Sequence, residues 1–439
     1  MQLNPLYALL LSSLLVFGCS DSNDSGSNTG TGTNTGTGTG TSACAKDITK
    51  GAALGITALP SSASSAYKKA LCKYTKVTAP NGKPIHIYAQ DKITNEQMIR
   101  ARSILEFYLT NVPGSQYGAD KTAIANQMAN NNAELVLLNG SDTGTPAVNG
   151  GQPLYQTENV VEGSTAYINN DYDNHRDAAF EEILHMVHDT GIGVDGANTL
   201  PGVLKTTYQK EIRRATNNAK PTWDSGKGLW AQNSTNWYNE LKAENSLTQE
   251  YLASVIDSYY GYWGAWTGGT GGMWGMYVAK TRDEIKTKDP EGWKLVDPSN
   301  LKFFSPWITY TARIDPTFND TFSLAFNAAQ PYTHKSQYLL NAQLLGNLHS
   351  GLTGNDQNNR LTGNNGNNTL TGGKGNDVLV GGAGIDTAKF SGNLSDYTIN
   401  TDANSGVTTI TDKVSGRDGT DKLSEIEMVE FKDQTINLL

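Results

Sequence analysis

The stretch GGKGNDVLV at residues 372–380 belongs to a run of four nine-residue units that follow one another without a gap. The other three units are GNDQNNRLT at 354–362, GNNGNNTLT at 363–371 and GGAGIDTAK at 381–389. A fixed period of this kind predicts a solenoid, in which each unit adds one step to a stack that no unit could form alone.

The leucines of these units distinguish a folded stack from a flexible linker. Leu352, Leu361, Leu370 and Leu379 lie nine residues apart, so each holds the same place in its unit. A glycine- and asparagine-rich linker would share the composition but not this phase. We therefore expect the four leucines to stack as one inner column.

The units resemble the repeats-in-toxin (RTX) nonapeptide, whose pattern is GGxGxDxUx with an apolar residue at U. The unit at 372–380 matches this pattern at every defined position. The resemblance implies an all-β parallel β-roll that binds Ca²⁺, because glycines permit the turns while aspartates and carbonyls supply hard oxygen ligands. The calcium-site residues that it implies are Asp377, Asp386, Gly372, Gly375, Gly381 and Gly384.

The two earlier units carry asparagine, at Asn359 and Asn368, where the later units carry aspartate. Neutral amide oxygens are weaker calcium ligands, so we expect weaker sites there. Carboxylates that repel one another without metal should make the folding of this region depend on calcium. We expect the roll at residues 341–390 and a β cap of closing strands at 391–439.

Composition and charge narrow the possible partners. The chain has 439 residues, 46 glycines and a formal net charge of -9. It contains no block of lysine or arginine that would neutralise phosphates, so nucleic acid is an unfavourable partner. An acidic surface suits a calcium-rich exterior, although many soluble proteins are simply acidic.

The N-terminus predicts export. Residues 6–18 form an apolar run that is short for a membrane span, which predicts a signal peptide at 1–18. The sequence from Val16 to Cys19 resembles a bacterial lipobox, which implies that Cys19 is lipidated and anchors the protein in the outer membrane. The alternative is an ordinary signal peptide followed by a coincidental cysteine. Residues 19–43 then form a Ser/Gly/Thr-rich flexible linker.

Two further cysteines, Cys44 and Cys72, lie at the start of the next domain. In an exported protein they are expected to pair as a disulfide, with two free thiols as the alternative.

Residues 44–340 have the pattern of an α+β domain. Residues 83–88 alternate like a strand, and 94–109 have the period of an amphipathic helix that Thr94 would cap. Two further strands are expected at 133–138 and 165–169.

A helix is expected at 175–191, where the sequence is HRDAAFEEILHMVHDTG. At about 100° per residue, Glu181, His185 and His188 share one face of such a helix, with Glu182 beside them. Carboxylate oxygens and imidazole nitrogens are both zinc ligands, so this face can hold a metal.

The string EEILH resembles the zincin motif HExxH, with Glu181 in place of the first histidine. Lethal-factor-like metallopeptidases of the zincin class take a further ligand from a glutamate at the start of an aromatic-rich downstream helix. Glu250 holds that place at 248–260. The resemblance implies a zincin-like fold, zinc bound by Glu181, His185 and Glu250, and Glu182 as the general base for peptide hydrolysis. His188 is an alternative ligand or a hydrogen-bond partner of one.

Three interpretations of the central domain remain open. The first is a surface-tethered metallopeptidase that acts on a peptide or protein substrate. The second is a non-catalytic RTX surface adhesin or binding protein that keeps a degenerate zincin fold, with the histidines in a polar seam. The third is carbohydrate binding by the aromatic segment at 259–277, which lacks a convincing pair of catalytic carboxylates.

Overall fold

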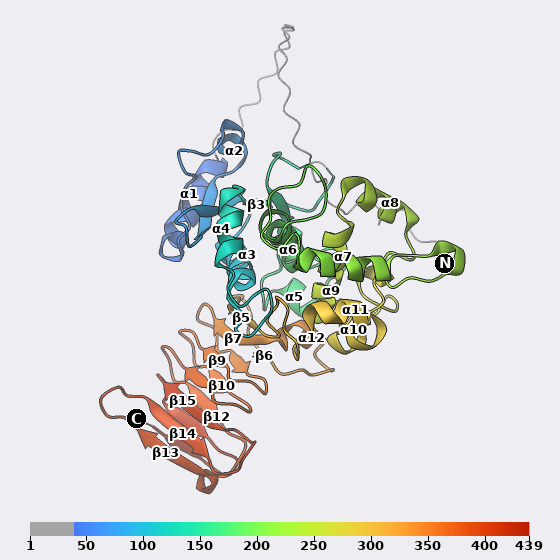
Figure 1. The fold of residues 1–439 in the computed structure, drawn as a ribbon. Coiled ribbons are helices and arrows are strands. Elements are labelled where there is room, and N and C mark those ends of the chain that lie inside the picture. The colour runs from blue at the N-terminus through green and yellow to red at the C-terminus, as the bar shows by residue number, and fades with distance from the viewer. Residues whose placement is uncertain (1–38, 145, 439) are drawn as a thin grey trace.

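The computed structural model describes residues 39–144 and 146–438 (Figure 1). A body of helices and one four-stranded sheet comes first, and an elongated stack of short strands follows it. The expected signal peptide at 1–18 and the lipidation site Cys19 lie outside the described residues. Of the helices in the described part, none is both long enough and apolar enough to cross a membrane.

The sheet of the body has the strand order β1-β2-β3-β4. β1 runs antiparallel to β2, whereas β2, β3 and β4 are parallel. The strands expected at 83–88 and 133–138 are confirmed as β2 and β3. The bounds are β1 (Lys73–Thr78), β2 (Pro84–Ala89), β3 (Glu134–Leu138) and β4 (Gln152–Tyr155).

Helix α3 (Asn95–Leu109) confirms the helix expected at 94–109. The Thr94 hydroxyl accepts a hydrogen bond from the N–H of Gln97 (3.1 Å), and the Gln97 side chain accepts one from the N–H of Thr94 (3.1 Å). This capping box satisfies two backbone donors at the helix start, where no carbonyl of the same helix is available.

The segment Thr165–Asn169, which we expected to be a strand, is instead the short helix α5. The Ser164 hydroxyl accepts a hydrogen bond from the N–H of Tyr167 (3.3 Å), and Asn170 ends the helix in the left-handed conformation. The strand prediction was wrong because it weighed the β-propensity of Thr, Tyr and Ile over these two caps.

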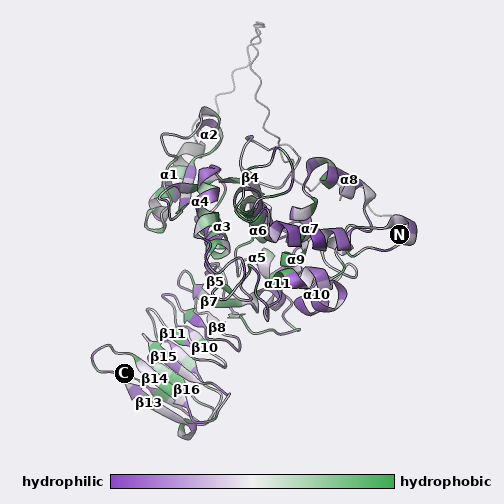
Figure 2. Cartoon of the chain, viewed as in Figure 1, coloured by the Kyte–Doolittle hydropathy of each residue, from purple (hydrophilic) through white to green (hydrophobic). Residues whose placement is uncertain are grey.

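Helices α6 (Ala179–Val187) and α9 (Leu247–Tyr259) pack against each other inside the body. In Figure 2, α6 is mostly green, whereas α7 (Tyr208–Ala219) and α10 (Arg282–Lys288) are largely purple. The α-helical part is shorter than the span of 175–191 that we expected, because the chain continues from α6 into a π-helical turn at His188–Ile192.

The remaining helices lie along the surface of the body and at its junction with the stack (Figure 1). Helix α1 begins at Thr39, so the backbone of residues 39–43, which we expected in the flexible linker, is helical. The bounds are α1 (Thr39–Gly51), α2 (Ser65–Ala70), α4 (Thr122–Asn130), α8 (Thr235–Glu244), α11 (Pro290–Val296) and α12 (Thr333–Ser336).

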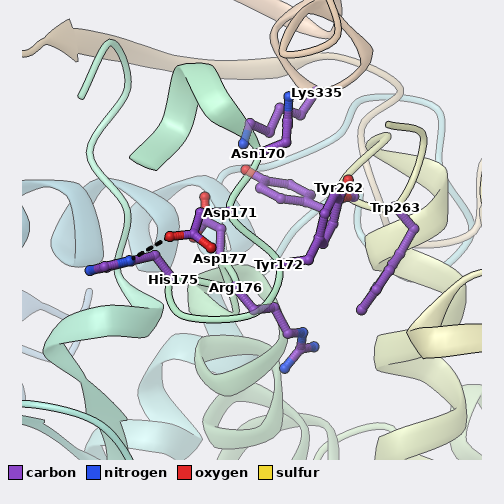
Figure 3. Close-up of a pocket in the computed structure, with 9 residues that line it drawn as sticks. All are labelled: Asn170, Asp171, Tyr172, His175, Arg176, Asp177, Tyr262, Trp263 and Lys335. Atoms are coloured by element: carbon purple, nitrogen blue, oxygen red, sulfur yellow. Dashed lines mark hydrogen bonds and ion pairs between the residues drawn. The ribbon is translucent and has the colours of Figure 1, made fainter. Parts of the chain in front are cut away.

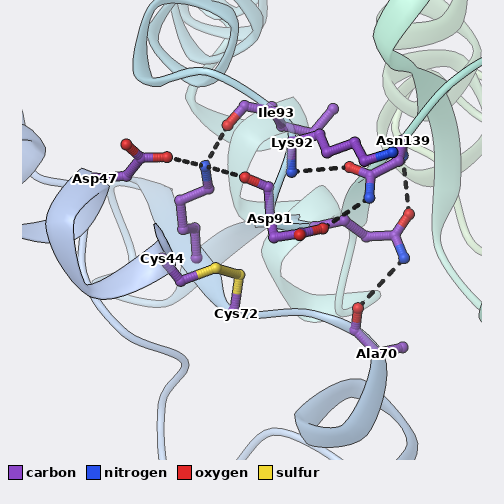
Figure 4. The surroundings of a disulfide bond; sticks show 10 residues. Cys44, Asp47, Ala70, Cys72, Asp91, Lys92, Ile93 and Asn139 are labelled. Carbon is purple, nitrogen blue, oxygen red and sulfur yellow. Dashed lines mark hydrogen bonds and ion pairs between the residues drawn. A yellow bond between two sulfur atoms is a disulfide. The ribbon is translucent and has the colours of Figure 1, made fainter. Parts of the chain in front are cut away.

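A disulfide between Cys44 and Cys72 joins α1 to the start of β1 (Figure 4). Beside it the buried ammonium of Lys73 pairs with Asp47 at 2.9 Å and donates to the carbonyl of Asp91 at 3.2 Å. The covalent link and the ion pair together hold α1 against the sheet.

The elongated stack is a two-sided roll. One of its sheets has the order β17-β16-β12-β10-β8-β6, and the other has the order β13-β14-β15-β11-β9-β7-β5. The bounds are β5 (Ile308–Ile314), β6 (Thr321–Ser323), β7 (Leu339–Leu344), β8 (Gly351–Thr353), β9 (Arg360–Thr362), β10 (Thr369–Thr371), β11 (Val378–Val380), β12 (Thr387–Lys389), β13 (Tyr397–Thr401), β14 (Thr408–Asp412), β15 (Thr420–Ser424), β16 (Met428–Glu430) and β17 (Thr435–Asn437).

The parallel ladders begin at β5 and β6, before the boundary at residue 341 that the repeats suggested. Those first strands carry no nine-residue pattern, so their stacking on the repeats could not be predicted from the period. The roll therefore starts at β5, and β5 also packs against α3 of the body.

The repeat leucines form two columns rather than the single column that we expected. Leu352 pairs in register with Leu370 in one sheet, and Leu361 pairs with Leu379 in the other. Successive units alternate between the two sheets, so one full turn of the roll takes two units. All four side chains are fully buried between the sheets.

A buried ion cluster holds α3, the approach to α6 and β5 together. The guanidinium of Arg100 donates to Glu162 (2.9 Å) and makes two hydrogen bonds to Asp177 (2.9 and 2.7 Å). The hydroxyl of Tyr310, in β5, donates to Glu162 (2.8 Å). This cluster positions the residues just before α6, which carries the candidate site.

Replacing Arg100 with methionine is expected to lower the free energy of unfolding by about 3–5 kcal/mol, because two buried carboxylates lose their cation. Urea unfolding of the full chain followed by tryptophan fluorescence measures the change. Lys374→Met, which breaks an exposed ion pair, is the control and should change stability by less than about 1 kcal/mol. Equal effects of the two substitutions would contradict this account of the cluster.

Candidate metal centres

In the roll, a side-chain oxygen of one turn accepts a hydrogen bond from the backbone of the neighbouring turn. The N–H of Asn359 donates to Oδ1 of Asp377 (2.7 Å), and the N–H of Asn368 donates to Oδ1 of Asp386 (2.6 Å). The Oδ2 atoms of both aspartates are buried and have no hydrogen-bond partner within the described chain. A buried carboxylate oxygen without a donor is unfavourable, so both atoms are suited to bind a cation.

The asparagine side chains of the two earlier units have hydrogen-bond partners within the protein and need no cation. Nδ2 of Asn359 donates to the carbonyl of Leu340 (3.1 Å), and Nδ2 of Asn368 donates to the carbonyl of Ser350 (3.0 Å). The amide thus supplies N–H donors to carbonyls that a cation would otherwise bind. The side chains of Asn359 and Asn368 are thus satisfied by protein groups, and the buried carboxylate oxygens without a donor belong to the two later units.

Two glycines allow the close approach of successive turns. Gly375 and Gly384 have φ values of +117° and +124°, and a methyl group on either would lie 2.6–2.7 Å from the carbonyl oxygen of Gln357 or Gly366. Side chains other than hydrogen are strained in this conformation. The glycines therefore bring the carbonyls of neighbouring turns near the aspartates.

Two other glycines leave room for the aspartate side chains. A methyl group on Gly372 would collide with Oδ2 of Asp377, and one on Gly381 would lie 2.6 Å from Oδ2 of Asp386. The four glycines of these two units therefore contribute by leaving room for side chains and by allowing the backbone to turn.

Burial raises the pKa of Asp377 to about 7 and the pKa of Asp386 to about 6. The charged form of each carboxylate is unfavourable in the metal-free roll, because water is excluded and donors are few. A calcium ion would supply the missing positive charge and favour the deprotonated form.

A second cluster of ligands lies between α6 and α9. Glu181 and His185 are on α6, and Glu250 is in the first turn of α9. One ligand atom from each of the three lies within 4.8 Å of the others. Nε2 of His185 and Oε1 of Glu250 are 3.6 Å apart, close to the roughly 3.4 Å expected between two ligands of a tetrahedral zinc ion with bonds of about 2.1 Å.

The ligand atoms of this cluster fit a divalent cation. Both carboxylate oxygens of Glu250, Oε1 of Glu181 and both ring nitrogens of His185 are buried without a hydrogen bond in the described part, and Oε2 of Glu181 contacts the Arg176 guanidinium. Burial lowers the pKa of His185 to about 3, so the ring is neutral and offers a lone pair. Burial also raises the pKa of Glu250 to about 8, which shows how poorly its charge is compensated by the protein.

Arg176 and Asp257 belong to the same cluster, and the sequence analysis missed both. Arg176 forms ion pairs with Glu181 and, at 3.2 Å, with Asp257. Its guanidinium also lies 5.5 and 5.3 Å from the ring centres of Trp263 and Trp274. Figure 3 shows the Arg176 side chain pointing away from the Lys335 end of the pocket that it helps to line. Asp257 follows Glu250 by seven residues, a spacing that could have placed it on the same helix face.

Glu182, the expected base, lies beside the ligands. Its Oε2 is 3.8 Å from Nδ1 of His185 and accepts a hydrogen bond from Gln152 (2.7 Å), which begins the edge strand β4. The Glu182 side chain is 13% exposed and Arg176 is 14% exposed, whereas the three ligand side chains are at most 1% exposed. Burial and the nearby Glu158 and Glu250 carboxylates raise the pKa of Glu182, which suits a group that takes up protons.

His188 is not part of the three-residue cluster. It follows the last residue of α6, and its Nε2 donates a hydrogen bond to Oε1 of Gln209 in α7 (2.6 Å). Its other ring nitrogen has no partner among the described residues. Sharing a helix face with Glu181 and His185 was therefore not enough to make His188 a third ligand.

The aromatic segment at 259–277 mostly packs inside the body. Tyr259, Tyr260 and Trp263 are buried, and the Tyr260 hydroxyl donates to the carbonyl of Ser305. The segment encloses Arg176 rather than forming an open platform for a sugar. This arrangement favours packing against the neighbouring helices over sugar binding as the role of the segment.

The two clusters define two classes of site: a repeat-based calcium module and a buried Glu-His-Glu centre. Residues 353–388 match the family of the RTX calcium-binding nonapeptide repeat (4 copies). The C-terminal roll is therefore built on RTX calcium-binding repeats, as the sequence pattern predicted. No curated protein matches the chain. The centre between α6 and α9 lies outside the matched residues.

The metal-free roll is expected to be more stable at pH 5 than at pH 8. The raised pKa values mean that folded Asp377 and Asp386 keep protons that the unfolded chain has lost, so this stability disappears as the pH rises through 6–7. Calcium binds the deprotonated form, so its apparent affinity should rise by about ten-fold or more over the same interval. Thermal unfolding with chelator and calcium titration measure the two effects.

The double variant Asp377→Asn/Asp386→Asn is the control for this experiment. It should lose the part of both pH effects that these two aspartates contribute, because asparagine does not titrate, and should keep the part due to Asp421, whose pKa burial raises to about 8. A wild-type roll with the same stability in chelator at both pH values would contradict the prediction.

Proposed function

We propose that the chain is an exported protein whose body is a zincin-like, zinc-dependent peptidase and whose C-terminal module binds calcium. The carrying observation is the buried cluster of Glu181, His185 and Glu250, in which Oε1 of Glu181, both oxygens of Glu250 and both ring nitrogens of His185 have no hydrogen-bond partner in the described chain, while Oε2 of Glu181 contacts Arg176. Unsatisfied buried atoms of this number are unfavourable unless a cation is bound among them.

The residues around the ligands support hydrolysis of a peptide. Zinc, when bound, supplies Lewis-acid activation of a water molecule. Glu182 adjoins the ligands, keeps some contact with solvent and is suited to hold the proton that the water loses. Gln152 orients Glu182 and also begins β4, the edge strand of the sheet. An extended peptide paired with that edge would pass beside Glu182.

An extracellular location also belongs to this proposal. The Cys44–Cys72 disulfide persists in oxidising surroundings, and a calcium module is useful where calcium is abundant. Anchoring in an outer membrane through lipidated Cys19 is supported by the sequence from Val16 to Cys19.

One observation favours the non-catalytic alternative. Arg176 already gives Glu181 and Asp257 a positive partner, so the cluster has a protein-derived cation at one end. If that pairing persisted in solution, the centre would be a structural ion network, and the protein would be an adhesin or binding protein. Arg176 forms no ion pair with Glu250, however, and burial keeps the pKa of Glu250 raised although the Arg176 charge lowers it.

Metal analysis of the full chain is expected to find about one zinc ion per molecule. His185→Ala should lose it, whereas Glu182→Gln should keep it and reduce peptide cleavage by about 10²–10⁴-fold, because only the base is removed. Arg176→Met should bind zinc more tightly, since it removes a competing cation. Mass spectrometry of metal content and cleavage of a peptide library measure these effects.

Glu240→Gln, on the exposed face of α8, is the matched control and should change neither metal content nor cleavage. The proposal fails if the wild-type chain, supplied with zinc, neither retains the metal nor cleaves any peptide. Retained zinc without cleavage would support binding and reject the peptidase.

A further inference from the structure

The cap contains a further unit of the repeat, separated from the others by an inserted hairpin. Residues 416–424 read GRDGTDKLS. They match GGxGxDxUx at Gly416, Gly419, Asp421 and Leu423, and depart from it at Arg417. This stretch lies beyond the residues that match the repeat family, which end at 388. This unit is hard to recognise in the sequence, because Arg417 departs from the pattern and an inserted hairpin separates the unit from the others.

The strand of this unit occupies the next place in the roll. β15 pairs in parallel with β11, and Leu423 is in register with Leu379. The same step relates β11 to β9, where Leu379 is in register with Leu361. Leu423 is buried, as the repeat leucines are. The inserted hairpin, β13 and β14, pairs antiparallel along the outer edge of β15.

The turn before β15 also repeats the hydrogen bond of the aspartates. The N–H of Asp377 donates to Oδ1 of Asp421 (2.8 Å), just as the N–H of Asn359 donates to Oδ1 of Asp377 (2.7 Å). Asp421 therefore has the same relation to the turn of Asp377 that Asp377 has to the turn before it.

A second hydrogen bond and a glycine confirm this equivalence. The N–H of Thr420 donates to Oδ1 of Asn376 (2.9 Å), as the N–H of Asn376 donates to Oδ1 of Asn358 (2.8 Å). Gly419 has a positive φ of +78° and lies so close to the carbonyl of Gly375 that any side chain would collide with it. Gly375 and the carbonyl of the turn before it show the same close approach.

The opposite sheet continues in the same way. β16 pairs in parallel with β12, and the N–H of Asp386 donates to Oε2 of Glu427 (2.7 Å). Both ladders of side-chain acceptors therefore pass from the repeats into the cap. Glu427 is partly exposed, whereas Asp421 is only 1% exposed, so Asp421 is the stronger site.

We propose that Asp421 is a calcium ligand and that the cap holds a further calcium ion between the turn at 372–377 and the turn at 416–421. One oxygen of Asp421 accepts the hydrogen bond from Asp377, and the other, to which no described residue donates, would bind the ion together with the turn carbonyls. Burial and the nearby carboxylates of Asp377, Asp418 and Asp412 raise the pKa of Asp421 to about 8. A cation in this place offsets that repulsion.

Asp418 is not a competing ligand for this ion. Its carboxylate accepts hydrogen bonds from the N–H and the hydroxyl of Ser391 (both 2.8 Å) and from the hydroxyl of Tyr397. These bonds fix the inserted hairpin against the turn and leave Asp421 as the carboxylate that faces the turn of Asp377.

Counting the calcium ions bound per full-length chain tests the proposal. Asp421→Asn keeps the oxygen that accepts from Asp377, and asparagine already holds the equivalent place at 359 and 368, so the roll should still form. Native mass spectrometry and calorimetric titration should show one calcium fewer than in the wild type. Asp402→Asn, in the exposed loop of the hairpin, should bind the wild-type number.

An unchanged calcium count in a folded Asp421→Asn chain overturns the proposal. If that variant does not fold, crystals of the wild-type chain grown with calcium decide the matter through anomalous scattering. A calcium peak beside the Asp421 carboxylate supports the assignment, and the absence of one there, with calcium present beside Asp377, overturns it.

Discussion

An oxygen atom buried away from water needs a positive or donating partner, and this constraint governs both parts of the protein. In the roll, Asn359 and Asn368 supply their own N–H donors, whereas Asp377 and Asp386 each leave one buried oxygen to which no described residue donates. Between α6 and α9, the carboxylates and imidazole of the buried cluster create the same need on a smaller scale. In each place the protein buries polar atoms and supplies too little positive charge to compensate them.

Amides come first along the roll and carboxylates come later, so the expected dependence on calcium increases with distance from the body. The first turns stack on β5 and β6, which pack against the body, and their asparagines require no metal. The later turns carry the unsatisfied aspartates. We therefore expect calcium to stabilise the outer turns more than the turns next to the body.

The body and the roll share one connected arrangement of buried groups. Tyr310 in β5 donates to Glu162, which pairs with Arg100 of α3, and Arg100 pairs in turn with Asp177. Asp177 follows Arg176, the cation of the Glu-His-Glu centre. A short path of side chains thus links the first strand of the calcium module to the neighbourhood of the candidate zinc site. The same contacts hold the segment that carries Arg176 in place.

The sequence by itself determined the features that depend on local pattern. The nine-residue period fixed the turns and the buried leucines, Thr94 fixed a helix start, and the spacing of Glu181 and His185 placed both on one helix face. Only the tertiary structure decided which distant groups meet. In the folded chain the leucines alternate between two sheets, and Arg176 and Asp257 join the buried centre. His188 bonds to Gln209 instead. Asp421 lies beside the turn of Asp377, although an inserted hairpin separates the two in the sequence. Local hydrogen bonds and side-chain periods act within a few residues, whereas packing selects among partners far apart in the chain.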